Sequence, residues 1–337
     1  MTSRAGIVCA GCWLVDDNKS IAHWPQEETL TTVLDRRLDG GGPAHNVAMD
    51  LARLGAPFPI TAMGAVGDDE AGRFLLDQCR ARGVDASRLR VLPGAATSRT
   101  DVMTVRATGK RTFFHFEGAN AQLAPDDFDF TGLAARLLHL GAPGVHRQLD
   151  RPNGGDPNGW VTVLRRARAA GLATNLELVS AAPEAVRRLA APCLEHLDTL
   201  IVNDYEAAAL TGRDAGDAAT ADAAGAAAAA LLQAGVRELV VVHFPTGCVA
   251  AHRDGRVLTR PSLRVPAAEV AGANGAGDAF AAGVLFGLHE GRPLEASLAL
   301  GHCTAAAALR SLSTTGAVGT AAECLALAER WGWRERA

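Results

Sequence analysis

The feature that most restricts the fold of this chain is a repeated alternation of short apolar runs with longer helical patterns. Six runs have the β-branched and aliphatic residues of buried strands, and they lie at 6–13, 59–67, 137–141, 172–179, 199–204 and 238–244. Helical patterns lie between or after them, at 43–55, 70–83, 161–171, 217–235, 277–290, 293–310 and 321–331. Many of them end in a glycine, which is a common helix stop. The alternation predicts an α/β protein with a mostly parallel sheet covered by helices on both faces.

Two segments depart from this alternation and predict a smaller sheet. In the stretch 100–118, polar and apolar residues alternate around "ATGKR", which is typical of a β-hairpin. Together with residues near 13–35, this hairpin predicts a second sheet. The sequence has no internal repeat and no obvious linker. We therefore expect one domain over residues 1–337.

Composition and charge argue against several classes of partner. The formal net charge is −4 and the basic residues are scattered, so no positive stripe predicts binding to nucleic acid. No apolar run is long enough to span a bilayer, and the first residues lack the apolar stretch of a signal peptide. We expect a cytoplasmic protein that binds neither nucleic acid nor membrane.

The seven cysteines do not indicate a disulfide framework, because their number is odd and they are spread along a long chain. Cys9 and Cys12 form a CxxC pair in a predicted buried strand, where residues three apart face opposite sides. No second CxxC or HxxxH is present to complete a zinc site. We interpret the pair as structural.

Several common catalytic motifs are absent. The chain has no GxxxxGK[ST], and its one Gly-Lys pair, at 109–110, is followed by arginine. No GxGxxG follows the first predicted strand, which argues against a nicotinamide-binding fold. HExxH and GxSxG are missing too, which removes the simplest hydrolase interpretations.

The stretch "GANGAGD", residues 272–278, is the first candidate site. Gly275, Ala276 and Gly277 have no large side chain, so their backbone amides are accessible to an anion at the start of the helix predicted from 277. Asp278 has two interpretations: it caps that helix, or it accepts a proton from an attacking hydroxyl beside the bound anion.

Two further stretches are candidates for binding. In "GGGPAHNVAMDLARLG", 40–55, the glycines precede a predicted helix, and Asn46 is either solvated or offers its amide to a ligand hydroxyl. "NDYE", 203–206, follows a predicted strand, and ligands bind at the carboxyl ends of parallel strands. Glu206 is then either a partner of the helix dipole or a carboxylate that holds a Mg²⁺-bound phosphate through water.

In this order, these stretches resemble the ribokinase-like family of sugar and nucleoside kinases, of the phosphofructokinase-B type. "GGGPAHNVAMDLARLG" is similar to the family's N-terminal signature, "NDYE" to its NxxE motif and "NGAGDAFAAG" to its C-terminal signature. "GAVGDDEAGRFLLDQCRARGVD" resembles the helix after the first signature, and "TSRTDVMTV" with "GKRTFF" and "GAN" resembles the lid strands and the residues after them. The resemblance covers nearly the whole chain. It implies a three-layer α/β/α ribokinase-like fold with a small β-sheet lid from segments near 13–35 and 98–118.

The resemblance also implies an activity, the ATP-dependent phosphorylation of a primary hydroxyl of a sugar or sugar derivative. Asp278 would be the general base, and the amides of Gly275, Ala276 and Gly277 would stabilise the transferring phosphoryl group. The implied binding residues fall into two groups: Asp16, Gly41, Gly42 and Asn46 for substrate, and Asn203, Glu206, Gly247 and Asn274 for the nucleotide, with Glu206 also for Mg²⁺. The lid would exclude water and pair two subunits into a homodimer.

Some residues depart from the family pattern. Gly272 stands where an Asp usually helps to arrange a monovalent-cation loop, so dependence on potassium is in doubt. Phe244 replaces the first glycine of a turn near the nucleotide and Pro245 follows it, so the ring either packs against adenine or narrows the site. Glu177 takes a strand-end position often held by Asp, where it either reaches the phosphates or partners a nearby amide.

The predicted sugar pocket has fewer polar groups than that of ribose-specific members. Leu14 stands in place of Asn, Pro43 in place of Lys, and Gly141 where some members have Glu. Ribose itself is therefore not the expected substrate. The alternatives are a nucleoside kinase of the same fold, which the low aromatic content of 5% disfavours, and a sugar-binding sensor without catalysis.

Overall fold

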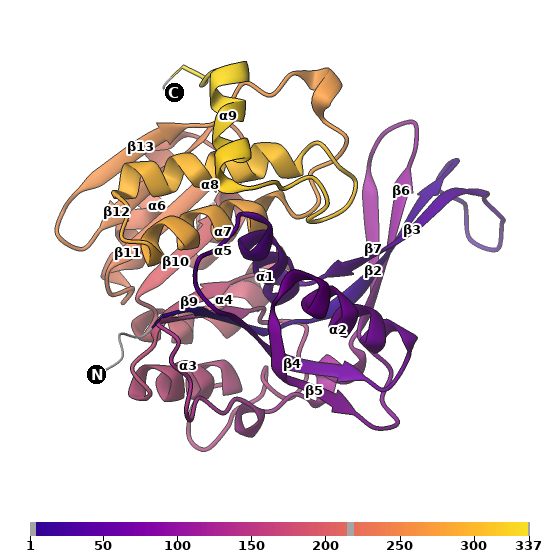
Figure 1. Ribbon diagram of the computed structural model, residues 1–337, viewed down its shortest axis with the longest axis horizontal. Helices are drawn as coiled ribbons and strands as arrows, with labels where there is room; N and C mark the ends of the chain where they lie inside the picture. Colours follow the sequence, from indigo (N-terminus) through magenta and orange to yellow (C-terminus); the bar gives the residue numbers. More distant parts are fainter. Residues whose placement is uncertain (1–4, 214–218, 336–337) are drawn as a thin grey trace.

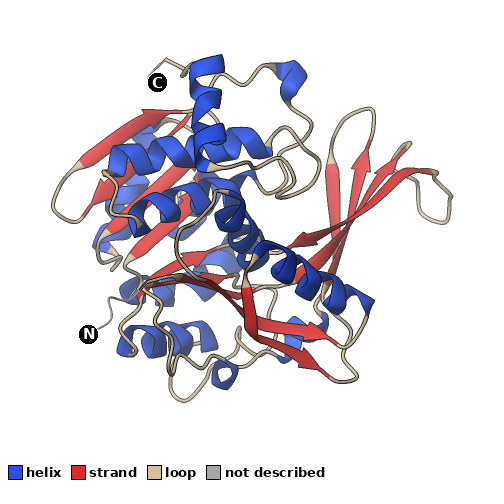
Figure 2. Ribbon diagram, viewed as in Figure 1, coloured by secondary structure: helices blue, strands red, loops and turns tan. Residues whose placement is uncertain are grey.

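The computed structural model describes residues 5–213 and 219–335, in which two sheets meet at an angle (Figure 1). Residues 217 and 218 of one predicted helix lie outside these ranges. Figure 2 shows helices on both sides of the larger sheet and none on the outer part of the smaller one. Within the described ranges, no helix is both long and apolar enough to cross a membrane.

The larger sheet has nine strands in the order β13-β12-β11-β10-β9-β8-β1-β4-β5. The pairs from β11 to β5 are all parallel, and β12 and β13 add an antiparallel edge. The strands are β1 (Ile7–Gly11), β4 (Ile60–Gly67), β5 (Asp85–Leu92), β8 (Leu137–Gly141), β9 (Ala173–Glu177), β10 (Thr199–Asn203), β11 (Leu239–Phe244), β12 (Gly247–His252) and β13 (Val257–Pro261).

Alternate residues of the central strands supply two separate hydrophobic cores. Ile7 and Cys9 of β1 pack under the helices α1, α2, α7, α8 and α9, whereas Val8 and Ala10 pack under α3, α4, α5 and α6. This period of two is that of a sheet buried on both sides, so the layers are α/β/α. The helices are α1 (Pro43–Arg53), α2 (Glu70–Arg82), α3 (Gly159–Ala169), α4 (Pro183–Ala190), α5 (Asp204–Thr211), α6 (Ala221–Gln233), α7 (Ala276–His289), α8 (Leu294–Ala308) and α9 (Ala321–Trp331).

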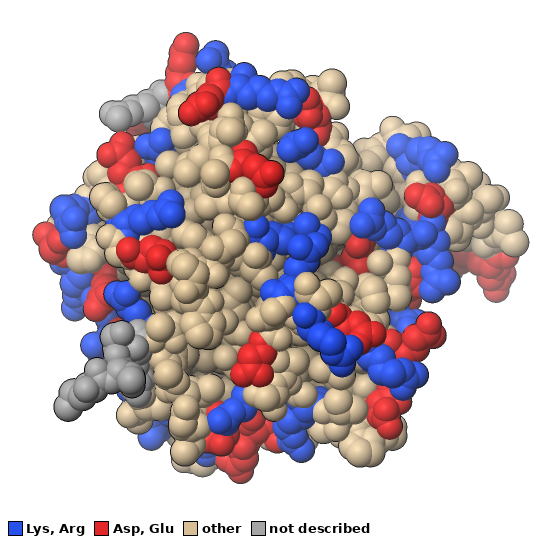
Figure 3. Space-filling model, in the orientation of Figure 1, with Lys and Arg blue, Asp and Glu red and all other residues tan. Residues whose placement is uncertain are grey.

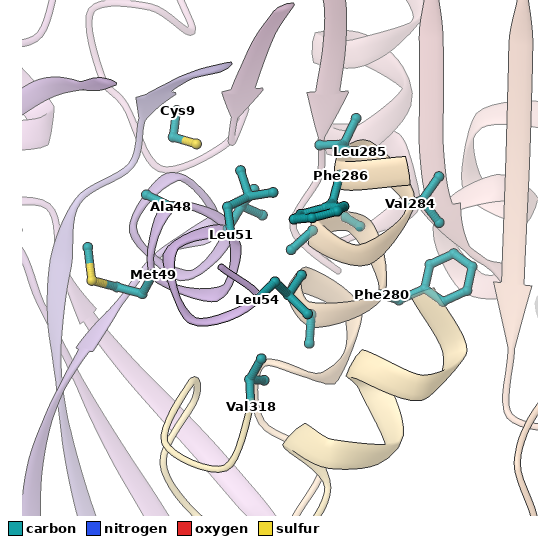
Figure 4. Packing of buried hydrophobic residues seen from close by; sticks show 14 of the residues in the cluster. Cys9, Ala48, Met49, Leu51, Leu54, Phe280, Val284, Leu285, Phe286 and Val318 are labelled. Atoms are coloured by element: carbon teal, nitrogen blue, oxygen red, sulfur yellow. The ribbon is translucent and has the colours of Figure 1, made fainter. Parts of the chain in front are cut away.

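Helix α7 lies between α1 and α8, and this packing positions the candidate site. Leu51 of α1 and Phe286 of α7 belong to one buried cluster, and Figure 4 shows their side chains between the two helices. Gly283 of α7 contacts α8 so closely that an added Cβ would lie 2.7 Å from the Cα of Gly301. The first turns of α1 and α7 therefore have fixed positions relative to each other.

The smaller sheet, here called the lid sheet, has the order β3-β2-β6-β7. Its strands are β2 (Leu14–Ile21), β3 (Val33–Gly41), β6 (Arg99–Val105) and β7 (Arg111–Phe116). β2 pairs antiparallel with β3 and parallel with β6, while β6 and β7 form the predicted hairpin. In Figure 1 these strands extend away from the central sheet.

The structure confirms the predicted fold class and differs in detail. All six predicted central strands are present, but β5, β12 and β13 were not predicted. Exposed residues interrupt the apolar pattern of β5 and β13, whereas β12 is buried but consists largely of small residues. The first lid segment also runs past residue 35, to Gly41, because β3 leads directly into α1. Figure 3 shows acidic and basic side chains interspersed on the face drawn.

Candidate active site

The first turn of α7 is shaped by Gly275, which is the N-cap residue with φ of 75°. A Cβ on this glycine would lie 2.3 Å from the carbonyl oxygen of Thr314, so a larger residue does not fit. The amide of Ala276 makes only a long hydrogen bond, 3.4 Å, to the carbonyl of Ala273. The start of this helix thus has amides and a dipole that favour an anion.

Asp278 lies in this first turn and contacts α1 rather than capping its own helix. No side chain caps α7, and Oδ2 of Asp278 accepts a hydrogen bond of 2.6 Å from Nδ2 of Asn46. Asn46 is itself fixed by His45, whose Nδ1 lies 3.0 Å from Asn46 Oδ1, and the other ring nitrogen of His45 contacts Gln78. The two signature stretches are therefore joined, although 232 positions separate Asn46 and Asp278.

Asp16 approaches the same site from β2. Asp16 is 8% exposed, and a Cβ on Gly41 would lie 2.4 Å from Asp16 Oδ2, so Gly41 leaves space for that carboxylate. Gly42 caps α1 with φ of 89°, and a Cβ there would lie 2.5 Å from the carbonyl oxygen of Cys12. The predicted substrate residues Asp16, Gly41, Gly42 and Asn46 thus lie together at the junction of lid sheet and central sheet.

The acids at this junction are unusually reluctant to ionise. Burial raises the pKa of Asp16 to about 7, and the nearby charges of Asp278 and Asp39 add to the shift. The pKa of Asp278 is raised well above its ordinary value by its protein surroundings and by Glu177, although the side chain keeps a partly exposed surface. No Lys or Arg of the described ranges contributes to either shift.

A cavity of about 500 Å³ lies beside the start of α7; it is called the second cavity below, to distinguish it from the junction that holds Asp16 and Asp278. It extends from the carboxyl ends of β10 and β11 to α8, and Asn203, Ala276 and Gly277 are among its lining residues. Its wall is aromatic: the ring of Phe280 lies 4.8 Å from that of His243 and 4.9 Å from that of His302, between ring centres. Burial lowers the pKa of His243 to about 4, so this imidazole is neutral at physiological pH.

The altered turn after β11 also borders this cavity. Phe244 and Pro245 both line it, and Phe244 is at the same time packed in the core, with 6% of its surface exposed. Gly247 is not among the residues that line the cavity. It pairs with Phe244 in the β11–β12 hairpin, and its Cα faces β13, where an added Cβ would lie 2.6 Å from the carbonyl oxygen of Arg260.

Asn203 and Glu206 form a reciprocal cap at the start of α5. Asn203 Oδ1 accepts a 2.8 Å hydrogen bond from the amide of Glu206, and the amide of Asn203 donates to Glu206 Oε2 at 3.2 Å. Ser180 donates to the other carboxylate oxygen at 3.1 Å. Burial raises the pKa of Glu206 to about 7, and the nearby charge of Asp278 contributes.

These contacts limit how a Mg²⁺ ion fits. Both oxygens of Glu206 are engaged, so a direct bond to the metal would require them to rearrange, whereas a contact through water would not. In the described ranges, no three His, Cys, Asp or Glu side chains are arranged to hold a metal ion. The donor set therefore fits Mg²⁺ that is bound mainly by phosphates and water.

Gly272, which precedes α7 and stands where the family usually has Asp, brings no carboxylate to the site. A Cβ on Gly272 would lie 3.3 Å from Leu312 Cδ2, in an apolar contact. The side-chain nitrogen of Asn274 is buried and has no hydrogen-bond partner in the described part of the chain.

Sequence reasoning missed the residues beneath Asp278. His139 is the one polar residue of the apolar strand β8, and its Nε2 lies 3.0 Å from Oε2 of Glu177. The sequence signal was a single polar residue in a buried strand, but such a residue does not indicate that its partner is Glu177. The aromatic group of His243, Phe280 and His302 was missed as well, because the three residues come from three separate elements.

Comparison with known proteins identifies the family. The family model described as pfkB family carbohydrate kinase matches residues 6–321. Probable fructokinase-7 of Arabidopsis thaliana is 29% identical over 293 residues, which cover 84% of this chain and 78% of that protein.

Solved structures share the fold. The ribokinase of Arabidopsis thaliana complexed with ribose and ATP has a TM-score of 0.77 and 21% identity, with 97% of this chain and 99% of that chain covered. The nucleoside kinase of Burkholderia thailandensis in complex with inosine has a TM-score of 0.75 and 22% identity, covering 98% and 100%. The fold is thus that of ribokinases. The chain belongs to the pfkB family of carbohydrate kinases, and it is a sugar or nucleoside kinase.

Proposed function

We propose that this kinase transfers the terminal phosphoryl group of ATP to a primary hydroxyl of a sugar or sugar derivative, with Asp278 as the general base. The observation that carries the proposal is the hydrogen bond between Asn46 and Asp278, next to a helix start whose Ala276 and Gly277 line the second cavity. This arrangement gives one acid access to both a substrate hydroxyl and a bound phosphate.

In the proposed reaction, Asp278 removes the proton of the substrate hydroxyl and the resulting oxygen attacks the terminal phosphorus of ATP. The bond from that phosphorus to the bridging oxygen breaks, and ADP leaves. The amides of Gly275, Ala276 and Gly277 donate to the charge on the transferring group. When bound, Mg²⁺ would neutralise phosphate charge, held through water by Glu206 with Asn203 beside it.

The nucleotide is proposed to occupy the second cavity. The structurally similar ribokinase of Arabidopsis thaliana was solved in complex with ATP. The rings of His243, Phe280 and His302 offer a flat wall against which an adenine ring could pack. Phe244 supports a packing role, because it lines the cavity from a fixed position in the core. The roles assigned to Gly247 and Asn274, and any use of a monovalent cation, remain predictions.

On the substrate side, Asp16 is proposed to accept hydrogen bonds from sugar hydroxyls. Leu14, Pro43 and Gly141 contribute no polar side chain, which disfavours ribose. One observation supports the nucleoside alternative. Phe113 is 54% exposed on the lid face that also has Asp16, as the register through β6 shows, so an aromatic surface is available to a base.

A homodimer through the lid sheet is proposed as well. The lid face opposite to Asp16 exposes Leu38, Phe114 and Phe116, and Trp24 stacks on Phe114 with 6.1 Å between ring centres. Apolar surface of this kind needs a cover, and a second lid sheet would supply one. Sedimentation as a monomer at micromolar concentration would refute the dimer. The cytoplasmic location stays a prediction.

The activity is tested by measuring ADP release from Mg-ATP with a panel of sugars and nucleosides, for the wild-type chain and for Asp278→Asn. Loss of a positioned base costs about 10²- to 10⁴-fold in turnover, and the melting temperature should change little because Asn has the same shape. Turnover of Asp278→Asn at the wild-type rate would exclude Asp278 as the base. Turnover only with nucleosides would favour the alternative.

A further inference from the structure

The strands β8 and β9 bring three polar side chains to the face of the central sheet that carries α7. Leu176 packs in the opposite core, so its neighbours Asn175 and Glu177 point toward α1 and α7, and His139 pairs with Asn175 in the sheet. His139 and Asn175 are fully buried and Glu177 is 9% exposed. Polar groups in such a position require partners, and the three residues contact one another, although Asn175 Oδ1, His139 Nε2 and Glu177 Oε2 form no regular hydrogen bond among the described residues.

The contacts among the three residues orient Glu177. Nδ2 of Asn175 lies 3.0 Å from Nδ1 of His139 and donates to it, which places the proton of the neutral imidazole on Nε2. That nitrogen lies 3.0 Å from Oε2 of Glu177, a close polar contact without the geometry of a regular hydrogen bond. His139 thus places a polar N–H beside one oxygen of Glu177.

The other contact of Glu177 is Asp278 itself. The two carboxyl groups lie within hydrogen-bonding reach of each other, while Asn46 occupies Oδ2 of Asp278. Two carboxylates in contact and largely shielded from water repel each other strongly, so the second ionisation is costly. A single proton between them removes the repulsion.

We propose that Glu177 and Asp278 form a carboxyl pair that shares one proton, in which Glu177 is a positioning residue that sets the protonation state of the base. This inference rests on the proposed function of Asp278. The shared proton blocks the base, so the reactive form is the one in which the pair has lost this proton and Asp278 is ionised. When Asp278 takes the substrate proton, the O–H bond of the substrate breaks, an O–H bond forms on Asp278, and the pair is again singly protonated as the negative charge moves to the attacking oxygen.

The surroundings of the pair favour retention of that proton. The groups whose charge acts on Asp278, or on which Asp278 acts, are Cys12 after β1, Asp16 of β2, His45 and Asp50 of α1, His139 of β8, Glu177 of β9 and Glu206 of α5. They are acids or neutral imidazoles, and none is a Lys or Arg. Burial raises the pKa of Glu177 to about 7, and that of Asp278 is raised well above its ordinary value. The pair is therefore expected to lose its shared proton only above neutral pH.

The test is the pH dependence of kcat/KM for Glu177→Gln against wild type. Replacing the carboxylate by an amide removes the repulsion, so Asp278 ionises more easily and the acid limb of the profile should move down by about one pH unit or more. Turnover on the plateau should stay within about tenfold of wild type, because Gln still reaches His139 and Asp278. Titration of ATP is common to both enzymes and does not enter the difference.

Asp50→Asn is the matched control. Asp50 is a fully buried acid one turn after Asn46, neither of its oxygens has a hydrogen-bond partner in the described chain, and burial keeps its pKa well raised. Burial therefore favours its neutral form, and the change to Asn should leave the acid limb in place. An active Glu177→Gln whose limb coincides with those of wild type and Asp50→Asn would overturn the pair.

Two further results separate the possible failures. If Asp278→Asn is fully active, the base assignment is wrong; if it is inactive and the limb of Glu177→Gln is unmoved, only the pair is wrong. Should Glu177→Gln not fold, carboxyl ¹³C NMR of the wild-type chain decides. A coupled titration with one midpoint above about pH 6 that disappears in Asp278→Asn supports the pair, and two independent ordinary titrations overturn it.

Discussion

Asp16 and Asp17 are neighbours on β2, yet they represent two different regions of the molecule. Asp16 faces the junction with the central sheet and has no cationic partner in the described ranges, and its pKa is raised to about 7, mainly by burial. Asp17 faces the outside of the lid sheet, where Arg36 binds both of its oxygens at 2.8 Å and Lys19 lies 2.9 Å away, so its pKa is lowered.

The contrast shows how the two regions use acids. On the outer face of the lid sheet, Lys19 forms ion pairs with Asp17 and Asp101, and Arg36 binds Asp17, so these acids are neutralised and join neighbouring strands. At the junction, Asp16, Glu177, Glu206 and Asp278 lack a Lys or Arg among the causes of their shifts. Unpaired buried acids cost stability, and such groups are common where a ligand supplies the missing partner. Changes to the inner face of the lid sheet are thus expected to affect ligand binding, whereas changes to the acids of its outer face are not.

The largest expected effect tests whether the lid sheet is separate from the core. Leu51→Ala removes a fully buried side chain between α1 and α7 and should lower the free energy of unfolding by about 2–5 kcal/mol. The same change at Leu38, which is 38% exposed on β3, should cost under about 1 kcal/mol. Urea unfolding measures both. Similar losses would mean that the lid sheet is as tightly packed as the core.

The next effect separates the two aspartates by binding. At a pH above about 7, where Asp16 is ionised, Asp16→Asn should raise KM for the sugar about ten- to hundredfold, since hydrogen bonds to a charged group contribute about 1.5–3 kcal/mol. Asp17→Asn should leave KM unchanged, because its partners Arg36 and Lys19 lie on the outer face. Steady-state kinetics at saturating ATP gives both values, and a rise in KM for Asp17→Asn would contradict the assignment of faces.

The smallest effect is the dependence of stability on pH, where the two aspartates should have opposite signs. The folded chain holds a proton on Asp16 more tightly than the unfolded chain does, so its contribution to stability is present below about pH 4 and is lost as pH rises through about 7. Asp16→Asn should therefore gain stability relative to wild type as pH rises over that window.

For Asp17 the sign is reversed. Its lowered pKa means that its contribution is present above its ordinary value of 3.8 and is lost as pH falls through the lower folded value. Asp17→Asn should be less stable than wild type at neutral pH, with the deficit disappearing in acid. The effect of each aspartate must be measured as a difference in stability from wild type. Buried imidazoles such as His139 and His302 have lowered pKa values, so they add stability as pH rises, whereas Asp16 loses it.

Much of the fold could be predicted because its signals are local. The period-two runs of β1 and β10, the glycine at the end of α2 and the "ATGKR" turn between β6 and β7 depend on residues a few positions apart. β5 could not be predicted in this way, since only Leu89 of its residues is buried and α2 separates it in the sequence from its partner β4.

The candidate site divides in the same way. The glycines of the first turn of α7 and the position of Asp278 follow from one short motif. The interpretation of Glu206 could not be decided from "NDYE", because a capping box and a metal-binding acid have the same spacing. The sequence left two partners open for Glu177, the phosphates or a nearby amide. In the structure, Glu177 contacts His139 and Asp278 instead.

What the sequence determined by itself is the set of elements and the two signatures, because backbone geometry, helix caps and turn types respond to near neighbours. Only the tertiary structure decided that His139, Glu177, Asn46 and Asp278 meet at one point. Strand order and helix packing bring them there, and these depend on the burial of apolar surface from the whole chain, which no local pattern contains.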